Sequence, residues 1–221
     1  MRKGMKLTIM GQNGAGKSTI FKMIKGEFKP RYGSINIDKG LRIAIAEQVV
    51  PTADKELTVQ AFFRKYFADD SVFNIDAKIG EVLRVVNLKA PLDKLISAFS
   101  GGQQARLLLA SALIQNPDIL LLDEPTNNLD ADGIRHLTDF LIAYKNTCLV
   151  ISHDADFLNA FTHGVLYLDV FTKKVEQYVG DYYDVVDRIN AQIEKENMEN
   201  ARLAKIAQAN KEQANVFANK G

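Results

Sequence analysis

The sequence predicts an α/β fold in which helices cover both faces of a mainly parallel sheet. Continuous apolar runs of strand length, at 119–123 and 147–152, each follow a segment of helical periodicity, as buried parallel strands do. A length of 221 residues suggests one compact unit with an appendage, since a domain commonly holds about 150 residues. The composition, 47% apolar and 25% charged, is typical of a globular chain with a sizeable core.

Charge and hydropathy exclude several classes of protein. The formal net charge of +1 gives no overall field that would steer the chain onto nucleic acid or anionic lipid. The longest apolar run is the five residues 140–144, whereas a membrane-spanning helix needs about twenty, so we expect no insertion into a bilayer. The apolar stretch at the N-terminus is too short and too interrupted for a secretory signal peptide, so we expect none. A single cysteine, Cys148, is predicted to be a buried strand residue, and we expect a cytoplasmic protein.

The first half of the chain predicts a strand, a glycine loop, a hairpin and helices, in that order. Residues 6–10 form a short apolar run, followed by a glycine-rich loop and a helical pattern. Alternating apolar residues between positions 35 and 45, on either side of Lys39-Gly40, predict a β-hairpin that forms a reduced antiparallel element. From about residue 57 to residue 88 the spacing becomes helical, so we expect a helical subdomain over about residues 55–115.

The second half predicts the central strands and a terminal helix. A closing hairpin is expected from 165–168 and 174–179. After Gly180-Asp181 the composition changes to that of a charged, mainly solvent-exposed helix. We therefore expect a nucleotide-binding domain over residues 1–180 and a helical linker over residues 181–221. Acidic and basic residues balance along this helix, which favours a linker over an RNA-binding arm.

A phosphate-binding loop follows the first predicted strand, where the sequence satisfies the pattern G-x-x-x-x-G-K-[ST]. Glycines let successive backbone N–H groups converge on an anion, and the following helix N-terminus adds partial positive charge. Lys17 is expected to reach the β- and γ-phosphates of a nucleotide, and the Ser18 hydroxyl to ligate Mg²⁺. The predicted nucleotide-binding residues here are Gly11, Gln12, Asn13, Gly14, Ala15, Gly16, Lys17, Ser18 and Thr19.

An acidic pair ends the predicted strand 119–123, at the edge where open α/β sheets bind ligands. Because side chains alternate along a strand, the two carboxylates should do different work. Asp123 is expected to hold Mg²⁺, and Glu124 to orient and deprotonate an attacking water. A merely solvated pair is the alternative, and the apolar strand together with the phosphate loop disfavours it.

A second glycine turn precedes another predicted helix, at Ser100, Gly101, Gly102 and Gln103. Over residues 4–180 the sequence resembles the ATP-binding cassette (ABC) ATPases, whose signature is Leu-Ser-Gly-Gly-Gln. In that family the signature of one cassette closes over the γ-phosphate that another cassette holds. The resemblance therefore implies ATP and Mg²⁺ as ligands, ATP hydrolysis, and a second cassette as partner, either a second copy or a further half.

Other motifs of the family follow in order. Gln48 is similar to the glutamine that contacts Mg²⁺ and couples the helical subdomain to the nucleotide. Asp130 matches an aspartate that bears on the partner's site, and His153 a histidine that contacts the γ-phosphate. The resemblance thus implies that Glu124, His153 and Lys17 carry catalysis, and that Ser18, Gln48 and Asp123 hold the metal.

The segment 124–130, Glu-Pro-Thr-Asn-Asn-Leu-Asp, is similar to one in ABC-F proteins, soluble ATPases with two tandem cassettes that act on the ribosome. The passage 179–182 into a charged helix also resembles ABC-F, whose linker reaches toward tRNA. The chain looks like a first cassette shortened at both ends, and no aromatic residue precedes Phe21 to stack on adenine. An ATP-binding subunit that docks on a transmembrane transporter partner is the alternative. A third, non-enzymatic possibility is a shortened chain that folds poorly or binds ATP without turnover.

Overall fold

The computed structural model describes residues 2–12, 14–67, 74–169 and 174–218. The chain divides into two compact units, Met1–Tyr182 and Tyr183–Gly221. The first unit contains the sheet and the helices that pack on it, and the described part of the second, up to residue 218, is the rest of one long helix. The predicted assignment of these regions to a nucleotide-binding domain and a linker stays a prediction.

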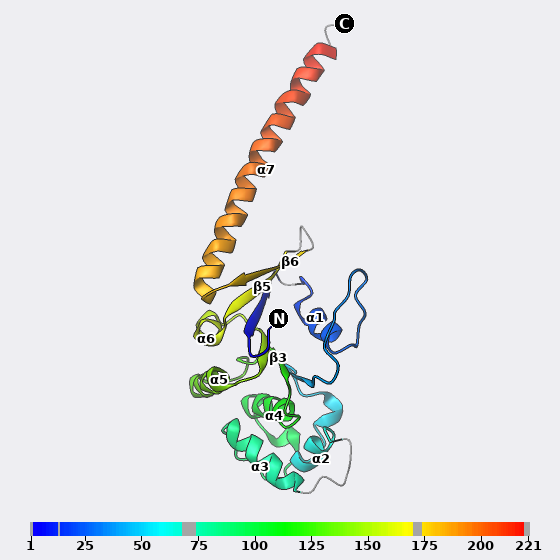
Figure 1. Cartoon of the computed structure of the whole chain (residues 1–221), viewed down its shortest axis with the longest axis vertical. Helices are drawn as coiled ribbons and strands as arrows, with labels where there is room; N and C mark the ends of the chain where they lie inside the picture. The colour runs from blue at the N-terminus through cyan, green and yellow to red at the C-terminus, as the bar shows by residue number, and fades with distance from the viewer. Residues whose placement is uncertain (1, 13, 68–73, 170–173, 219–221) are drawn as a thin grey trace. The chain divides into compact units, whose positions relative to one another are not determined.

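A six-stranded sheet in the order β2-β3-β4-β1-β5-β6 forms the centre of the first unit, as far as the described residues show (Figure 1). Its strands are β1 Lys6–Gly11, β2 Ile43–Ala46, β3 Ile119–Asp123, β4 Thr147–Ile151, β5 Gly164–Asp169 and β6 Lys174–Val179. All neighbouring strands pair in parallel except β5 and β6, which are antiparallel. The predicted mainly parallel sheet is confirmed, and so is the closing hairpin.

The two faces of the sheet pack into different cores. On β3, Leu120 and Leu122 belong to one buried cluster and Leu121 to another, because successive side chains of a strand point to opposite faces. Helices α5 Ala131–Ala143 and α6 Ala155–Phe161 cover the first face, and α1 Lys17–Ile24 covers the second through Phe21 (Figure 1). Cys148 of β4 is fully buried, as predicted. Helices therefore cover both faces, as the apolar runs indicated.

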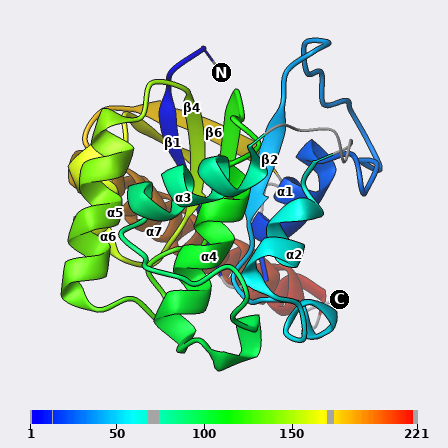
Figure 2. The same ribbon diagram turned by 90° about the horizontal axis from the view of Figure 1, so that it is seen from below.

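Three helices form the part of the first unit that lies nearest the viewer in Figure 2. These are α2 Val59–Arg64, α3 Ile75–Val85 and α4 Gly101–Leu113, accompanied by the 3₁₀ helices Thr52–Asp54 and Ile96–Ala98. The helical spacing is confirmed on α3, where Ile75, Ile79 and Leu83 face the core. Part of the stretch expected to be helical, residues 68–73, lies outside the described residues.

The hairpin predicted between residues 35 and 45 is wrong. Residues 34–42 form no strand, and Ile43–Ala46 instead pairs in parallel with β3, with Ile43 opposite Ile119. Ile35 and Leu41 are each 41% exposed. Alternation of apolar and polar residues reports that one face is covered, but it does not report which strand is the partner. The antiparallel element of this sheet is the β5–β6 pair.

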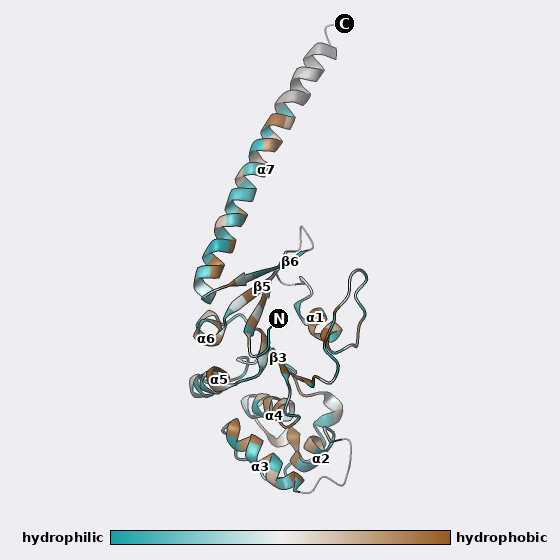
Figure 3. Ribbon diagram, viewed as in Figure 1, coloured by the Kyte–Doolittle hydropathy of each residue, from teal (hydrophilic) through white to brown (hydrophobic). Residues whose placement is uncertain are grey.

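Helix α7, Tyr182–Ala218, has 37 residues and confirms the helix predicted after residue 181. Figure 3 shows mainly hydrophilic residues along its described part, with scattered apolar ones. Exposed apolar side chains include Met198, Leu203 and Ile206. Among the described residues, no helix combines the length and the apolar content that a membrane span requires.

We expect Leu149→Ala to lower the free energy of unfolding by about 2–5 kcal/mol, since it empties space in the core between the sheet and α1. Leu149 lies on the central strand β4 and is 1% exposed. Urea denaturation followed by circular dichroism measures the change. Leu41→Ala, at a side chain that is 41% exposed, is the matched control and should cost much less. Equal losses in the two variants would contradict the packing described.

Candidate active site

The loop between β1 and α1 is shaped by its glycines. Gly14 and Gly16 have φ angles of +80° and +93°, in the left-handed region that other residues adopt with strain. Gly16 caps α1, and no side chain among the described residues accepts a hydrogen bond from the first N–H groups of this helix. These amides, at the positive end of the helix dipole, are therefore available to an anion.

Lys17, the first residue of α1, turns back over the loop. Its Nζ donates to the carbonyl oxygens of Gly11 at 2.8 Å and Gln12 at 3.2 Å. The ammonium group is thereby held at the loop rather than free in solvent. Gly11 itself ends β1, and a Cβ on it would lie 3.0 Å from the carbonyl oxygen of Leu168, so the close approach of β1 and β5 favours glycine there.

A pocket of about 380 Å³ lies against this loop. It brings together residues predicted for the nucleotide, for the metal and for catalysis, from four separate regions of the sequence. Its lining consists of Gly14, Gly16, Lys17, Ser18, Thr19, Gln48, Asp123, Glu124, Ile151 and His153. Gly11, Gln12 and Ala15 belong to the loop but not to the lining, and Asn13 lies outside the described residues.

Glu124 occupies a strained position directly after β3. Its φ is +50°, which is uncommon for a residue with a side chain, and its N–H donates to the carbonyl oxygen of Ile151 at 2.8 Å. The Glu124 side chain is 13% exposed, and its Oε1 lies 3.3 Å from Nε2 of His153. Burial raises the pKa of Glu124 above its ordinary value, and interaction with His153 partly opposes that increase.

Two buried hydroxyls join the segments that carry Glu124 and His153. Thr126 Oγ1 lies 3.3 Å from Ser152 Oγ, which also accepts a hydrogen bond from the N–H of Asp154 at 3.1 Å. The link fixes the loop after β3 against the loop after β4, and so helps to set the contact between Glu124 and His153. Sequence reasoning missed Thr126, because only a tertiary distance identifies its role.

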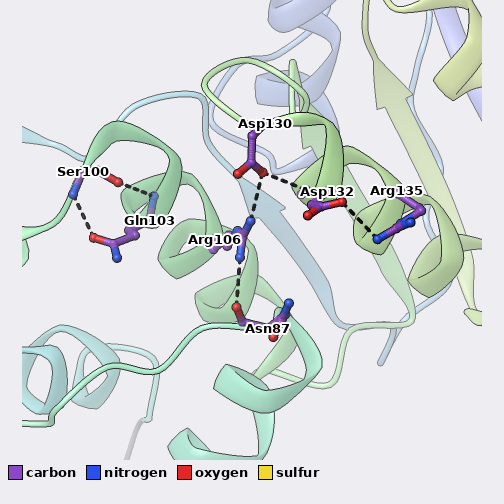
Figure 4. Close-up of polar contacts among 8 residues, drawn as sticks. Asn87, Ser100, Gln103, Arg106, Asp130, Asp132 and Arg135 are labelled. Carbon is purple, nitrogen blue, oxygen red and sulfur yellow. Dashed lines mark hydrogen bonds and ion pairs between the residues drawn. The ribbon is translucent and has the colours of Figure 1, made fainter.

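The second glycine turn lies in a different pocket. Ser100 caps α4: its Oγ accepts from the N–H of Gln103 at 3.3 Å, and Gln103 Oε1 accepts from the Ser100 N–H at 3.0 Å (Figure 4). A pocket of about 450 Å³ adjoins this turn and is lined by Asn87, Leu88, Lys89, Ser100, Gly102, Gln103, Arg106, Asn128, Leu129 and Asp130. Gly101 begins α4 beside Asn128. The two pockets share no lining residue.

The donors in the first pocket suit a metal that takes most of its ligands from phosphate and water. Among the described residues there is no group of three or more His, Cys, Asp or Glu side chains that could hold a metal ion. Asp123, Ser18 and Gln48 supply oxygen atoms in one pocket, beside a loop built for anions. Mg²⁺ has six ligands in octahedral geometry, and proteins often supply only a few of these oxygen atoms while phosphate and water supply the rest.

Comparisons with known proteins agree with this geometry. A protein-family model described as ABC transporter matches residues 1–127. The uncharacterized ABC transporter ATP-binding protein YkpA of Bacillus subtilis is 32% identical over 208 residues, which cover 79% of this chain and 38% of that protein. The probable ATP-binding protein YheS of Escherichia coli K12 is 34% identical over 218 residues, covering 95% of this chain and 33% of that protein. The chain thus spans well under half the length of these two curated relatives.

Solved structures show the same fold. The ATP-binding cassette MJ0796, in a dimeric post-hydrolysis state bound to ADP and Pi, matches with a TM-score of 0.66 at 24% identity, covering 81% of this chain and 87% of that one. RNase-L Inhibitor matches with a TM-score of 0.64 at 28% identity, covering 86% of this chain and 37% of that one. Because the family model covers more than half of the chain, the chain belongs to the ABC transporter family, with the fold of its ATPase cassettes.

Proposed function

We propose that the chain binds Mg²⁺-ATP in the first pocket and hydrolyses it when a second cassette closes over the nucleotide. The observation that carries this proposal is the separation of the two anion-binding turns into pockets that share no residue. This separation favours a nucleotide that meets the first turn in one cassette and the second turn in another. The dimeric MJ0796 cassette bound to ADP and Pi supports such pairing.

Nucleotide binding would rest on the loop before α1. The uncapped N–H groups after Gly16 would donate to the phosphates. The Lys17 ammonium would exchange its bonds to the Gly11 and Gln12 carbonyls for phosphate oxygens. Ser18, Gln48 and Asp123 would hold Mg²⁺, which offsets phosphate charge when bound.

Glu124 would act as the general base in hydrolysis. A water attacks the γ-phosphorus in line, the bond to the bridging oxygen breaks, and Glu124 accepts the proton of the water. A raised pKa makes this carboxylate a stronger base than an ordinary glutamate. His153 and Lys17 would offset charge on the γ-phosphate, together with Ser100 and Gly102 of a second cassette.

For the biological setting we propose an ABC-F type ATPase that acts on the ribosome in translation, in the cytoplasm. The segment 124–130 supports this assignment, and so does α7, which begins three residues after β6 ends and would be the linker after a cassette spanning residues 1–180. The length of YheS leaves room for a second cassette. The second candidate is the ATP-binding subunit of a membrane transporter, which the description of the family model favours.

Replacing the proposed base should separate binding from turnover. We expect Glu124→Gln to keep ATP affinity and to lower kcat by about a hundredfold or more, because an amide cannot accept the proton. Lys17→Ala should instead weaken ATP binding, since it removes the ammonium held at the phosphate loop. Single-turnover hydrolysis and fluorescent-nucleotide titration measure the two effects. Parental turnover in Glu124→Gln would show that another group is the base.

The pKa of Glu124 predicts the pH below which activity is lost. Only the deprotonated carboxylate accepts a proton, so kcat/KM should fall as the pH decreases through this pKa. Because burial raises the pKa, the acid limb should lie above the ordinary glutamate value of about 4.3. His153→Gln removes an interaction that lowers the pKa, so the limb of its residual activity should move to still higher pH. A limb at or below the ordinary value would contradict the assignment.

Sedimentation distinguishes the two settings. We expect the Glu124→Gln chain with ATP to sediment with purified ribosomes. Blocked hydrolysis would prolong the paired, ATP-bound state, which would keep segments outside the cassette, such as α7, in their ribosome-binding position. The same chain with ADP is the control and should remain in the supernatant. Association with membrane fractions alone would reject the ribosomal proposal and favour the transporter subunit.

A further inference from the structure

Arg106 connects three segments beside the second pocket. It lies on α4, six residues after the capping residue Ser100, and points toward the end of α3 and the start of α5 (Figure 4). Nη1 donates to the carbonyl oxygen of Asn87 at 2.9 Å, and Nη2 donates to Asp130 Oδ1 at 3.3 Å. The same Oδ1 accepts from the N–H of Gly133 at 2.8 Å and so caps α5.

We propose that Arg106 is a positioning residue that holds Asp130 and the Ser100 turn as one rigid unit for the second cassette to meet. This inference rests on the proposed function, since Asp130 and Ser100 would act on the nucleotide of the partner cassette. In this proposal Arg106 acts through Asp130 rather than on that nucleotide. Its guanidinium presents donors in two fixed directions, which a lysine ammonium cannot reproduce.

The backbones of the same two segments also touch. A Cβ on Gly102 would lie 2.5 Å from the carbonyl oxygen of Asn128, so only glycine permits this contact. The turn and residues 128–130 therefore meet twice, once through Gly102 and once through Arg106. Two separate contacts fix relative orientation as well as distance, which one contact cannot do.

Gly133 provides the space that the guanidinium needs. A Cβ at this position would lie 2.9 Å from Arg106 Nη2 and 2.9 Å from Asp130 Oδ1. Alanine would favour the helix α5, yet it would push the guanidinium away from the carboxylate. Gly133→Ala therefore separates the pair without changing a charge.

The contribution of this pair is to geometry rather than to stability. The Asp130 side chain is 75% exposed, and exposed ion pairs stabilise folded chains little. The variants should therefore fold. By contrast, displacement of a catalytic group by about 1 Å can cost about a hundredfold in rate. A loss of turnover without a loss of folding or ATP affinity is the signature of a positioning role.

The test uses Arg106→Lys, with Arg135→Lys as the matched control. Arg135 forms an ion pair with Asp132, and both residues lie on α5, the helix that Asp130 caps. The side chains of Arg135 and Asp132 are 75% and 83% exposed. We expect Arg106→Lys to lower kcat by about ten- to a hundredfold, to leave the ATP affinity of the unpaired chain unchanged, and to speed hydrogen exchange at residues 128–133. Arg135→Lys should leave all three unchanged, and Gly133→Ala should follow Arg106→Lys in kcat.

A double-mutant cycle tests the link itself. If Arg106 acts through Asp130, Arg106→Lys combined with Asp130→Asn should lose no more turnover than the worse single variant. Losses that multiply would overturn the proposal, as would parental turnover in Arg106→Lys. Loss of ATP affinity in the unpaired Arg106→Lys chain would overturn it too, because Arg106 would then support the whole cassette.

Hydrogen exchange separates this inference from the proposed function. It reports the Arg106–Asp130 link in the isolated chain, whether or not that chain hydrolyses ATP. Unchanged exchange at residues 128–133 in Arg106→Lys would overturn the inference alone. Failure of the parental chain to bind or hydrolyse Mg²⁺-ATP would overturn the proposed function, while faster exchange in the variant would still support the link.

Discussion

Unpaired backbone N–H groups at the start of α1 are the constraint on which the site depends. A helix begins with donors that it cannot satisfy itself, and here no side chain in the described part of the chain accepts from them. The left-handed conformations of Gly14 and Gly16 leave these donors uncovered. An anion is the natural acceptor, and the position of Lys17 over the loop adds a full positive charge to the partial charge of the helix.

The strand order places the other groups beside that anion site. In the order β2-β3-β4-β1, four parallel strands end at one edge of the sheet, and residues shortly after each end line one pocket. Gln48 follows β2, Glu124 follows β3, His153 follows β4, and the glycine loop follows β1. Residues more than a hundred positions apart thus meet because the sheet is parallel, whereas an antiparallel arrangement would send alternate ends to opposite edges.

The buried strands and the turns that carry the candidate site residues could be predicted from local sequence patterns, because each motif is a single turn at the end of a single element. Buried runs and the helix after Ser100 depend on residues close in the sequence. The hairpin between residues 35 and 45 failed, since alternation does not determine the partner of a strand. The Thr126–Ser152 and Arg106–Asp130 contacts could not be predicted either, because each depends on distances between separate elements.

Division of the donors between two pockets also explains how hydrolysis could drive movement. A ligand shifts an equilibrium only by the difference between its affinities for the two states. Under the proposed function, a triphosphate held by the α1 loop of one cassette would offer its γ-phosphate to the α4 turn of another, whereas a diphosphate would not reach that turn. Binding would therefore favour the paired state, and cleavage would remove the preference. The larger the part of the affinity that comes from the second cassette, the greater the free energy available for separation.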